Sequence, residues 1–312
     1  MTKDLAKNAM LISANVINGG LLGERRDATA TELVENTFFV TQRRTKTSKW
    51  LIDRKHKSVR RCVASAQRIR EIIWHHTMPW GHDKMRLVPV KIHAELAGKL
   101  ETAIADLKDA WDEFIIAYPS LVAASERELG GLFDRSQYPS ADRARTLFKV
   151  SINYWPLPDP GQFLAEIAKD AADEAKAAIG LEIETRLLEG SQDMLRRARE
   201  TIETMVSKLE KYVPVFEGKV EGVFRDSLID NVRDMAGLIE KLNLTDNREI
   251  NEIATKMLRL SAHSAQALRD RTSLRVNAVQ SGKELLAKLD NLDLRDKEVN
   301  DILAGVSDYL ED

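Results

Sequence analysis

Residues 162–212 form an almost unbroken helical pattern, which restricts the fold of this chain more strongly than any other feature. In the later part of the pattern, apolar residues recur at spacings that alternate between three and four positions. They are Leu195, Ala198, Ile202, Met205, Leu209 and Tyr212. Such spacing is typical of the a/d seam of a coiled coil or helical bundle. Pro214 ends the pattern, so we expect one long helix with an apolar face.

The remaining C-terminal sequence repeats this pattern. Residues 219–242 carry a second apolar stripe, and residues 247–280 place a third on heptad positions, two of which hold the polar residues Ser264 and Arg271. Polar residues at such positions either set the register of the helices or mark where the seam becomes exposed. Shorter helices are expected at 282–289 and 296–310. The pattern predicts long antiparallel helices joined by short turns, with no strand.

An apolar seam needs a partner surface, which a second chain or another helix of the same chain can supply. We expect the seam to include Leu195, Ile202, Leu209, Ile250, Met257 and Leu260. A homo-oligomer is therefore expected, and a bundle within one chain is the alternative.

The N-terminal half alternates between short extended segments and helices, which predicts a small α+β module. The expected elements are strands at 10–17, 38–41 and 148–155 and helices at 27–34, 58–76, 91–117 and 120–129. Tyr118-Pro119 is expected to end the helix at 91–117. Three prolines and a glycine at 156–161 predict a boundary between domains at 1–157 and 162–312. The expected fold class is mainly α, with a small α+β N-terminal module followed by long antiparallel helices.

Composition excludes several classes of protein. Hydrophobic residues make up 43% of the chain and charged residues 31%, which excludes a wholly disordered protein. No apolar run approaches the roughly 18 residues that span a bilayer, and residues 1–20 lack the features of a signal peptide. Because Cys62 is the single cysteine, an internal disulfide and a cysteine zinc cluster are both excluded. We expect a cytoplasmic protein without a membrane partner.

Charge is distributed unevenly along the chain. Residues 1–93 contain 18 Lys and Arg against 8 Asp and Glu, whereas residues 94–312 contain 29 against 41. The basic excess is concentrated at 43–70 and includes Arg43, Arg44, Lys46, Lys49, Arg54, Lys55, Arg60 and Arg61. These cations bind a polyanion such as nucleic acid, meet an acidic surface of this chain or of a partner, or simply form a solvated face of the molecule.

The helical part of this basic segment has an apolar stripe of its own. Its members follow helical spacing and are Val59, Val63, Ala66, Ile69, Ile73 and His76. Because the arginines fall mostly off the stripe, one helix can combine a buried face with a basic surface.

Few residues suggest catalytic chemistry. Five histidines lie between His56 and His93, near Cys62, and a metal site built from His76, His82 and Asp83 is conceivable. The spacing of zinc proteases, H-E-x-x-H, is absent, as are the phosphate-binding glycine motifs. Cys62 has no identifiable histidine and acid partners for nucleophilic catalysis. We predict neither a catalytic residue nor a cofactor.

Three segments of the N-terminal half form a recurring pattern: Leu87-Val88-Pro89, Tyr118-Pro119, and the stretch LGGLFDRSQYPSADRARTLFKVSINYWPLPDPGQF at 129–163. On these residues the chain resembles a family of uncharacterised proteins carried by bacteriophages and prophages. It covers roughly residues 10–165, and the later helices resemble the family's variable coiled tail.

The family has a domain of unknown function and no assigned catalytic residues. Its members are often encoded beside a MoxR-like AAA+ ATPase and a von Willebrand factor A-type (VWA-type) protein. The resemblance therefore implies an accessory role in a bacterial host cell, with one of these proteins as a partner. This chain has no Walker motif, so it would not be the motor.

Three functional hypotheses follow from the sequence. The first is a non-enzymatic phage or prophage adaptor that binds a protein partner and associates with itself. The second is a nucleic-acid-binding protein that uses the basic segment 43–70. The third is a metal-dependent enzyme around His75–Asp83.

Overall fold

A computed structural model describes residues 5, 7–41, 44–81, 85–157, 169–216 and 219–292. Within these ranges the chain is mainly helical, with a small antiparallel sheet, which confirms the expected fold class. None of the helices in these ranges is long and apolar enough to cross a membrane.

The elements up to residue 156 alternate between strands and helices. They are β1 (Ala9–Asn18), β2 (Glu24–Arg26), α2 (Ala28–Thr37), β3 (Ser48–Trp50), α3 (Lys57–His76), β4 (Met78–Pro79), β5 (Arg86–Pro89), α4 (Val90–Leu129), the 3-10 helices η1 (Gly130–Leu132) and η2 (Arg135–Gln137), α5 (Ala141–Thr146) and β6 (Phe148–Pro156). The order of the larger sheet is β4-β5-β1-β6, and β2 pairs with β3 in a separate antiparallel ribbon. The predicted strands at 10–17 and 148–155 are confirmed as β1 and β6.

The elements after residue 168 are helices interrupted by one hairpin. They are α6 (Lys169–Lys211), β7 (Val213–Phe216), β8 (Lys219–Glu221), α7 (Ser227–Leu242), α8 (Arg248–Leu260), α9 (Ala265–Asp270) and α10 (Thr272–Asp290). The β7–β8 hairpin corrects the expectation of a strand-free C-terminal half, because Pro214 ends the helix and the chain then pairs antiparallel with itself. The helix expected at 296–310 lies outside the described residues.

The chain divides into two compact units, and neither is continuous in sequence. Unit 1 comprises Met1–Ile12, His76–His93 and Tyr154–Asp312, and unit 2 comprises Ser13–His75 and Ala94–Asn153. This division differs from the contiguous ranges 1–157 and 162–312, because β4 packs on α6 and β5 packs on α7.

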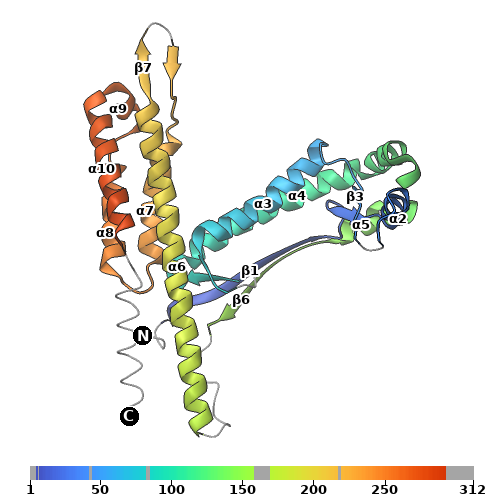
Figure 1. The fold of residues 1–312 in the computed structure, drawn as a ribbon, viewed down its shortest axis with the longest axis horizontal. Coiled ribbons are helices and arrows are strands. Elements are labelled where there is room, and N and C mark those ends of the chain that lie inside the picture. Colours follow the sequence, from blue (N-terminus) through green and yellow to red (C-terminus); the bar gives the residue numbers. More distant parts are fainter. Residues whose placement is uncertain are drawn as a thin grey trace. The chain divides into compact units, whose positions relative to one another are not determined.

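The helices of unit 1 form a bundle within one chain. Helix α6 packs against α7 and α10, and α8 packs against both α7 and α10 (Figure 1). Gly282 allows α10 to approach α6 closely, since a Cβ atom at this position would lie only 2.4 Å from Cγ2 of Val206.

The third predicted helix is divided into α8, α9 and α10. Ser264 is not a seam residue but the N-cap of α9, where its hydroxyl accepts a hydrogen bond from the Ala267 amide.

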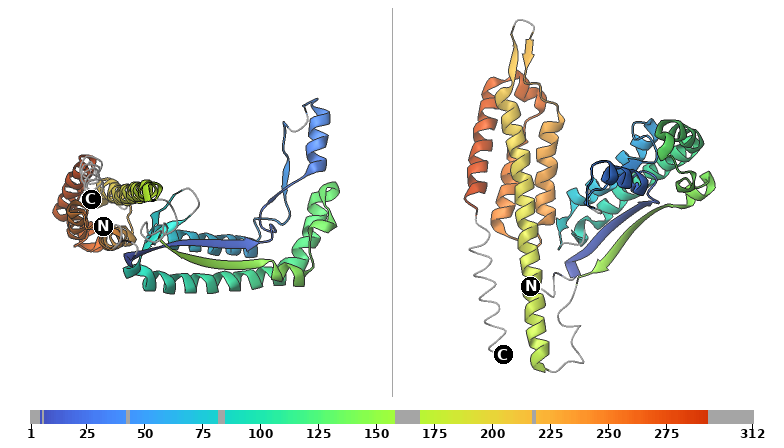
Figure 2. Two further views of the ribbon diagram at one scale, coloured as in Figure 1. Left: turned by 90° about the horizontal axis from the view of Figure 1, so that it is seen from below. Right: turned by 45° about the vertical axis from the view of Figure 1, so that its right-hand side comes forward.

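Unit 2 is organised around α3 and α4, which contact each other through a shared apolar core (Figure 1). The predicted helix end at Tyr118-Pro119 is wrong, because α4 continues to Leu129 with Pro119 inside it. Tyr118 and Leu121 are both buried in the core on either side of the proline. This packing outweighs the local cost of the proline, and α4 is bent toward its C-terminal end (Figure 2).

Candidate functional site

Lys49 lies in the interior of unit 2 and not on a binding surface. Its side chain is 7% exposed, and its ammonium group lies 2.7 Å from the Asp27 carboxylate, which is equally buried. The ammonium group also donates to the carbonyl oxygen of Leu132. Asp27 in turn caps α2 by accepting from the Ala30 amide at 2.8 Å. The hydrogen bond from Lys49, together with the Ala30 amide, lowers the pKa of Asp27.

Arg61 is exposed, but an acidic residue of the same unit neutralises it. Its guanidinium group pairs with Glu113 of α4, and this hydrogen bond raises the pKa of Arg61 further. Asp109 and Asp106 contribute to the same effect. At this residue the basic segment therefore meets an acidic part of its own chain, which is one of the alternatives that the sequence left open.

Five of the eight predicted cations remain at the surface of unit 2. Arg44, Lys46, Arg54, Lys55 and Arg60 are exposed, and we call them the cationic surface. None of them forms an ion pair with another of the residues that the structure describes. The guanidinium group of Arg54 stacks over the ring of Trp50, at 4.1 Å from its centroid. Arg43 lies outside the described residues.

Helix α3 continues the basic surface beyond Arg60. Arg68 and Arg70 are exposed, as expected for residues off the apolar stripe. The stripe itself is confirmed at Val59, Ile69, Ile73 and His76, which are buried, but Val63 is exposed and Ala66 is half-buried. The buried face runs through Cys62 instead, because that residue packs against α4.

The fold reduces the charge asymmetry that the sequence displays. Unit 2 combines the basic segment with the acidic residues of α4, so it contains 20 Lys and Arg against 16 Asp and Glu. Its net charge of +4 is smaller than the net +10 of residues 1–93. A basic surface persists because the cations are concentrated at 44–70, while carboxylates of α4 neutralise particular arginines such as Arg61.

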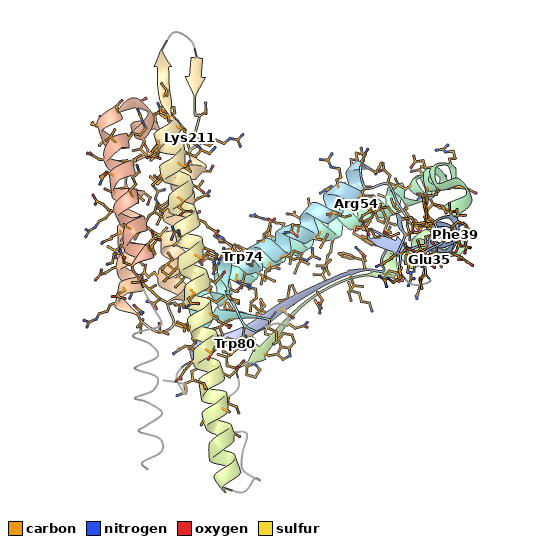
Figure 3. The ribbon with its side chains drawn as sticks, viewed as in Figure 1. Glu35, Phe39, Arg54, Trp74, Trp80 and Lys211 are labelled. Atoms are coloured by element: carbon orange, nitrogen blue, oxygen red, sulfur yellow. The ribbon has the colours of Figure 1, made fainter. Side chains whose placement is uncertain are left out.

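Two aromatic residues that the sequence analysis assigned to a strand belong to the surface of unit 2. The predicted strand at 38–41 is wrong, because α2 ends at Thr37 and a turn follows. Phe38 is 71% exposed and Phe39 is 94% exposed. The sequence signal that could have indicated this exposed site is a pair of adjacent phenylalanines directly after a capped helix, followed by arginines. Figure 3 shows Phe39 beside Glu35 at the end of α2.

The predicted metal site is not assembled by the described residues. His76 is buried at the end of α3 and His75 is exposed, while His82 and Asp83 lie outside the described ranges. Among the residues that can be placed, no group of three His, Cys, Asp or Glu side chains could hold a metal ion.

Cys62 is held as a neutral thiol. Its sulfur donates to the carbonyl oxygen of Ala110 at 3.1 Å, and burial raises its pKa to about 12. The nearby Arg61 lowers that pKa, but by less than burial raises it. Because a thiolate is the reactive form, this residue is a poor nucleophile.

The predicted seam residues lie in the bundle of unit 1. Ile202, Leu209, Ile250, Met257 and Leu260 are buried within one chain. Leu195 is half-buried, because the buried face of α6 runs through its neighbour Met194. These seams are therefore covered by other helices of the same bundle and do not require a second chain.

Comparisons with known proteins add no relative: neither a family model, nor a curated protein, nor a solved structure matches this chain. The resemblance of residues 10–165 to a phage-associated family therefore stays a prediction.

Proposed function

We propose that this protein is a non-enzymatic accessory protein that acts by binding, and that the cationic surface of unit 2 contacts a nucleic acid. The observation that carries the proposal is the exposure of five cations, Arg44, Lys46, Arg54, Lys55 and Arg60, without an ion-pair partner among the described residues. Cations that are not already neutralised can displace counterions from phosphates, which gives affinity without any base contact.

The contrast with neighbouring basic residues supports this assignment. Lys49 and Arg61 belong to the same basic segment, yet each is neutralised by a carboxylate of its own unit, Asp27 and Glu113 respectively. The remaining cations are spread from the segment before β3 to the first turn of α3, where Trp50 supports Arg54. This distribution suits a ligand with charges repeated along its length, as a nucleic acid has.

A protein partner is the second candidate, and the mixed charge of α3 and α4 favours it. Asp106, Asp109 and Glu113 lie near Arg61, so this side of unit 2 presents both signs of charge. Charges of both signs suit electrostatic complementarity with another protein better than they suit a continuous line of phosphates. An AAA+ ATPase or a VWA-type protein is the partner that the family resemblance suggests, and self-association belongs to the same hypothesis.

The first experiment measures the mass of the purified protein in solution by light-scattering chromatography at low and high salt, with absorbance at 260 and 280 nm. Co-purifying nucleic acid that is released at high salt is expected. Fluorescence anisotropy with labelled oligonucleotides then gives the salt dependence. If all five cations contact phosphates of a single strand, affinity is expected to fall roughly 100-fold between 50 and 200 mM salt.

Variants decide between the two candidates. Replacing Arg44, Lys46 and Arg60 by alanine is expected to reduce the magnitude of the salt slope by about 2, because three phosphate contacts are lost. Arg259→Ala removes an exposed arginine from unit 1 and serves as the matched control. Binding that is indifferent to salt and to these substitutions would reject the nucleic acid. A salt-stable complex with the AAA+ ATPase or VWA-type protein would then support the adaptor.

A further inference from the structure

The end of α2 carries the most exposed aromatic residues of unit 2. Phe39 is 94% exposed and Phe38 is 71% exposed, and Leu33 of α2 is 65% exposed. Figure 3 labels Phe39 at the end of α2. Single exposed apolar residues are common on protein surfaces, but adjacent large ones on one helix end are typical of a contact site. Among the described residues, neither ring belongs to the apolar core of unit 2.

The backbone at Phe39 adopts a conformation that phenylalanine disfavours. Its φ is +53°, in the left-handed region where glycine is the usual residue. The Val40 amide donates to the Glu35 carbonyl at 2.9 Å and the Phe38 amide donates to Val34 at 3.1 Å, so Phe39 occupies the position after a helix where glycine is enriched. A large side chain here has a local cost, and it gains no burial within unit 2.

The segment 44–47 is hydrogen-bonded to α2, the helix that precedes the two rings. The Thr47 amide donates to the Thr31 hydroxyl at 3.0 Å, and the Thr45 hydroxyl donates to the Glu35 carboxylate at 3.1 Å. These bonds place the segment that contains Arg44 and Lys46 along α2. Hydrogen bonds therefore connect the segment with the exposed cations to the helix that ends at the exposed rings.

We infer that this end of unit 2 binds single-stranded nucleic acid, with unpaired bases stacked on Phe38 and Phe39 and phosphates against Arg44 and Lys46. The inference rests on the proposed function and assigns its substrate class. A ring that projects from the surface can stack on a base only when that base is not paired inside a duplex. Combined aromatic and cationic contacts of this kind bind single strands with little preference for sequence.

The test compares three fluorescein-labelled probes of equal length: oligothymidylate, an abasic strand and a duplex. The abasic strand retains the phosphates but has no bases, so it isolates stacking from charge. Wild-type protein is expected to bind oligothymidylate most tightly, because each stacked base strengthens binding by roughly 5- to 150-fold.

Phe39→Gly is the decisive variant, because it removes the ring while relieving the left-handed backbone. It is expected to weaken binding of oligothymidylate about tenfold and to leave the affinity for the abasic strand unchanged. The Tm of the protein is expected to stay the same or to rise. Phe38→Ala provides a second variant. Ile116→Ala, which removes a side chain that is 78% exposed on α4, is the matched control and is expected to bind like wild type.

The outcomes separate the inference from the proposed function. Unchanged oligothymidylate binding by both phenylalanine variants, with salt-dependent binding retained, overturns the inference and leaves the proposed function standing. Equal losses for the abasic strand or the duplex also overturn it, because the rings would then not contact bases. Failure of wild-type protein to bind any of the three probes rejects the proposed function itself.

Discussion

Replacing Lys49 with methionine is expected to destabilise unit 2, because it leaves the Asp27 carboxylate in the interior without its countercharge. Both side chains are 7% exposed, and the two charged groups are 2.7 Å apart. Removing one partner of a buried pair costs about 3–5 kcal/mol of the free energy of unfolding. Asp27 keeps its hydrogen bond from the Ala30 amide, so we expect a loss near the lower limit, about 3 kcal/mol.

A double-mutant cycle isolates the ion pair from other effects. Asp27→Asn preserves an oxygen that can cap α2, so this variant removes the charge and keeps the cap. We expect each single variant to cost more than half of what the double variant costs, with a coupling energy of about 2 kcal/mol. Such coupling arises because the first substitution already removes the attraction between Asp27 and Lys49.

The assay is urea denaturation followed by tryptophan fluorescence and far-UV circular dichroism. Trp111 in the core of unit 2 contributes to the fluorescence signal. Lys46→Met is the control, because Lys46 is exposed and its replacement is expected to change stability by less than about 0.5 kcal/mol. Coupling below about 0.5 kcal/mol, or equal effects of Lys49→Met and Lys46→Met, would refute the assignment of a buried, structural ion pair.

Four further predictions concern pH dependence, backbone strain, helix packing and thiol reactivity. Because its pKa is lowered, Asp27 contributes stability that is complete above its ordinary pKa near 3.8 and is lost as the pH falls through the lower folded value. Acid titration of the unfolding free energy is therefore expected to be shallower below pH 4 in Asp27→Asn. Phe39→Gly is expected to raise the free energy of unfolding by about 1 kcal/mol in urea denaturation, since φ is +53° there. Gly282→Ala is expected to lower it by about 1–3 kcal/mol, because the new Cβ would overlap Val206. With a pKa of about 12, Cys62 is expected to react with Ellman's reagent at pH 8 only after denaturation, and rapid reaction of the folded protein would contradict its burial.

The helices could be predicted from the sequence because burying one face of a helix imposes a periodic pattern. The seam residues Ile202, Leu209 and Met257 are buried, as their spacing indicates. Helix ends were harder to predict, because they depend on hydrogen bonds that periodicity does not encode. Ser264 lies on the heptad spacing yet caps α9. Pro119 is a residue that disfavours a helix interior, yet it lies inside α4.

The candidate surface could be predicted in part. A run of basic residues shows where cations are concentrated, but their availability depends on residues that are distant in sequence. Lys49 is neutralised by Asp27, 22 positions earlier, and Arg61 by Glu113, 52 positions later. Pairing over such separations depends on how the chain folds, so a single sequence cannot distinguish a free cation from a neutralised one.

Lys49 and Phe39 are both exceptions to the usual distribution of residues, one a buried cation and the other an exposed aromatic ring. The exception at Lys49 is compensated inside the molecule, because Asp27 and the Leu132 carbonyl satisfy the ammonium group. The exception at Phe39 is not compensated by packing, since 94% of the residue remains exposed in a backbone conformation that favours glycine. When contacts within the fold offset the free-energy cost of an unfavourable residue, the stability of the fold explains that residue. When no such contact offsets the cost, the residue points to a contact outside the chain. By this criterion the end of α2 is a stronger candidate for binding than the number of basic residues alone would suggest.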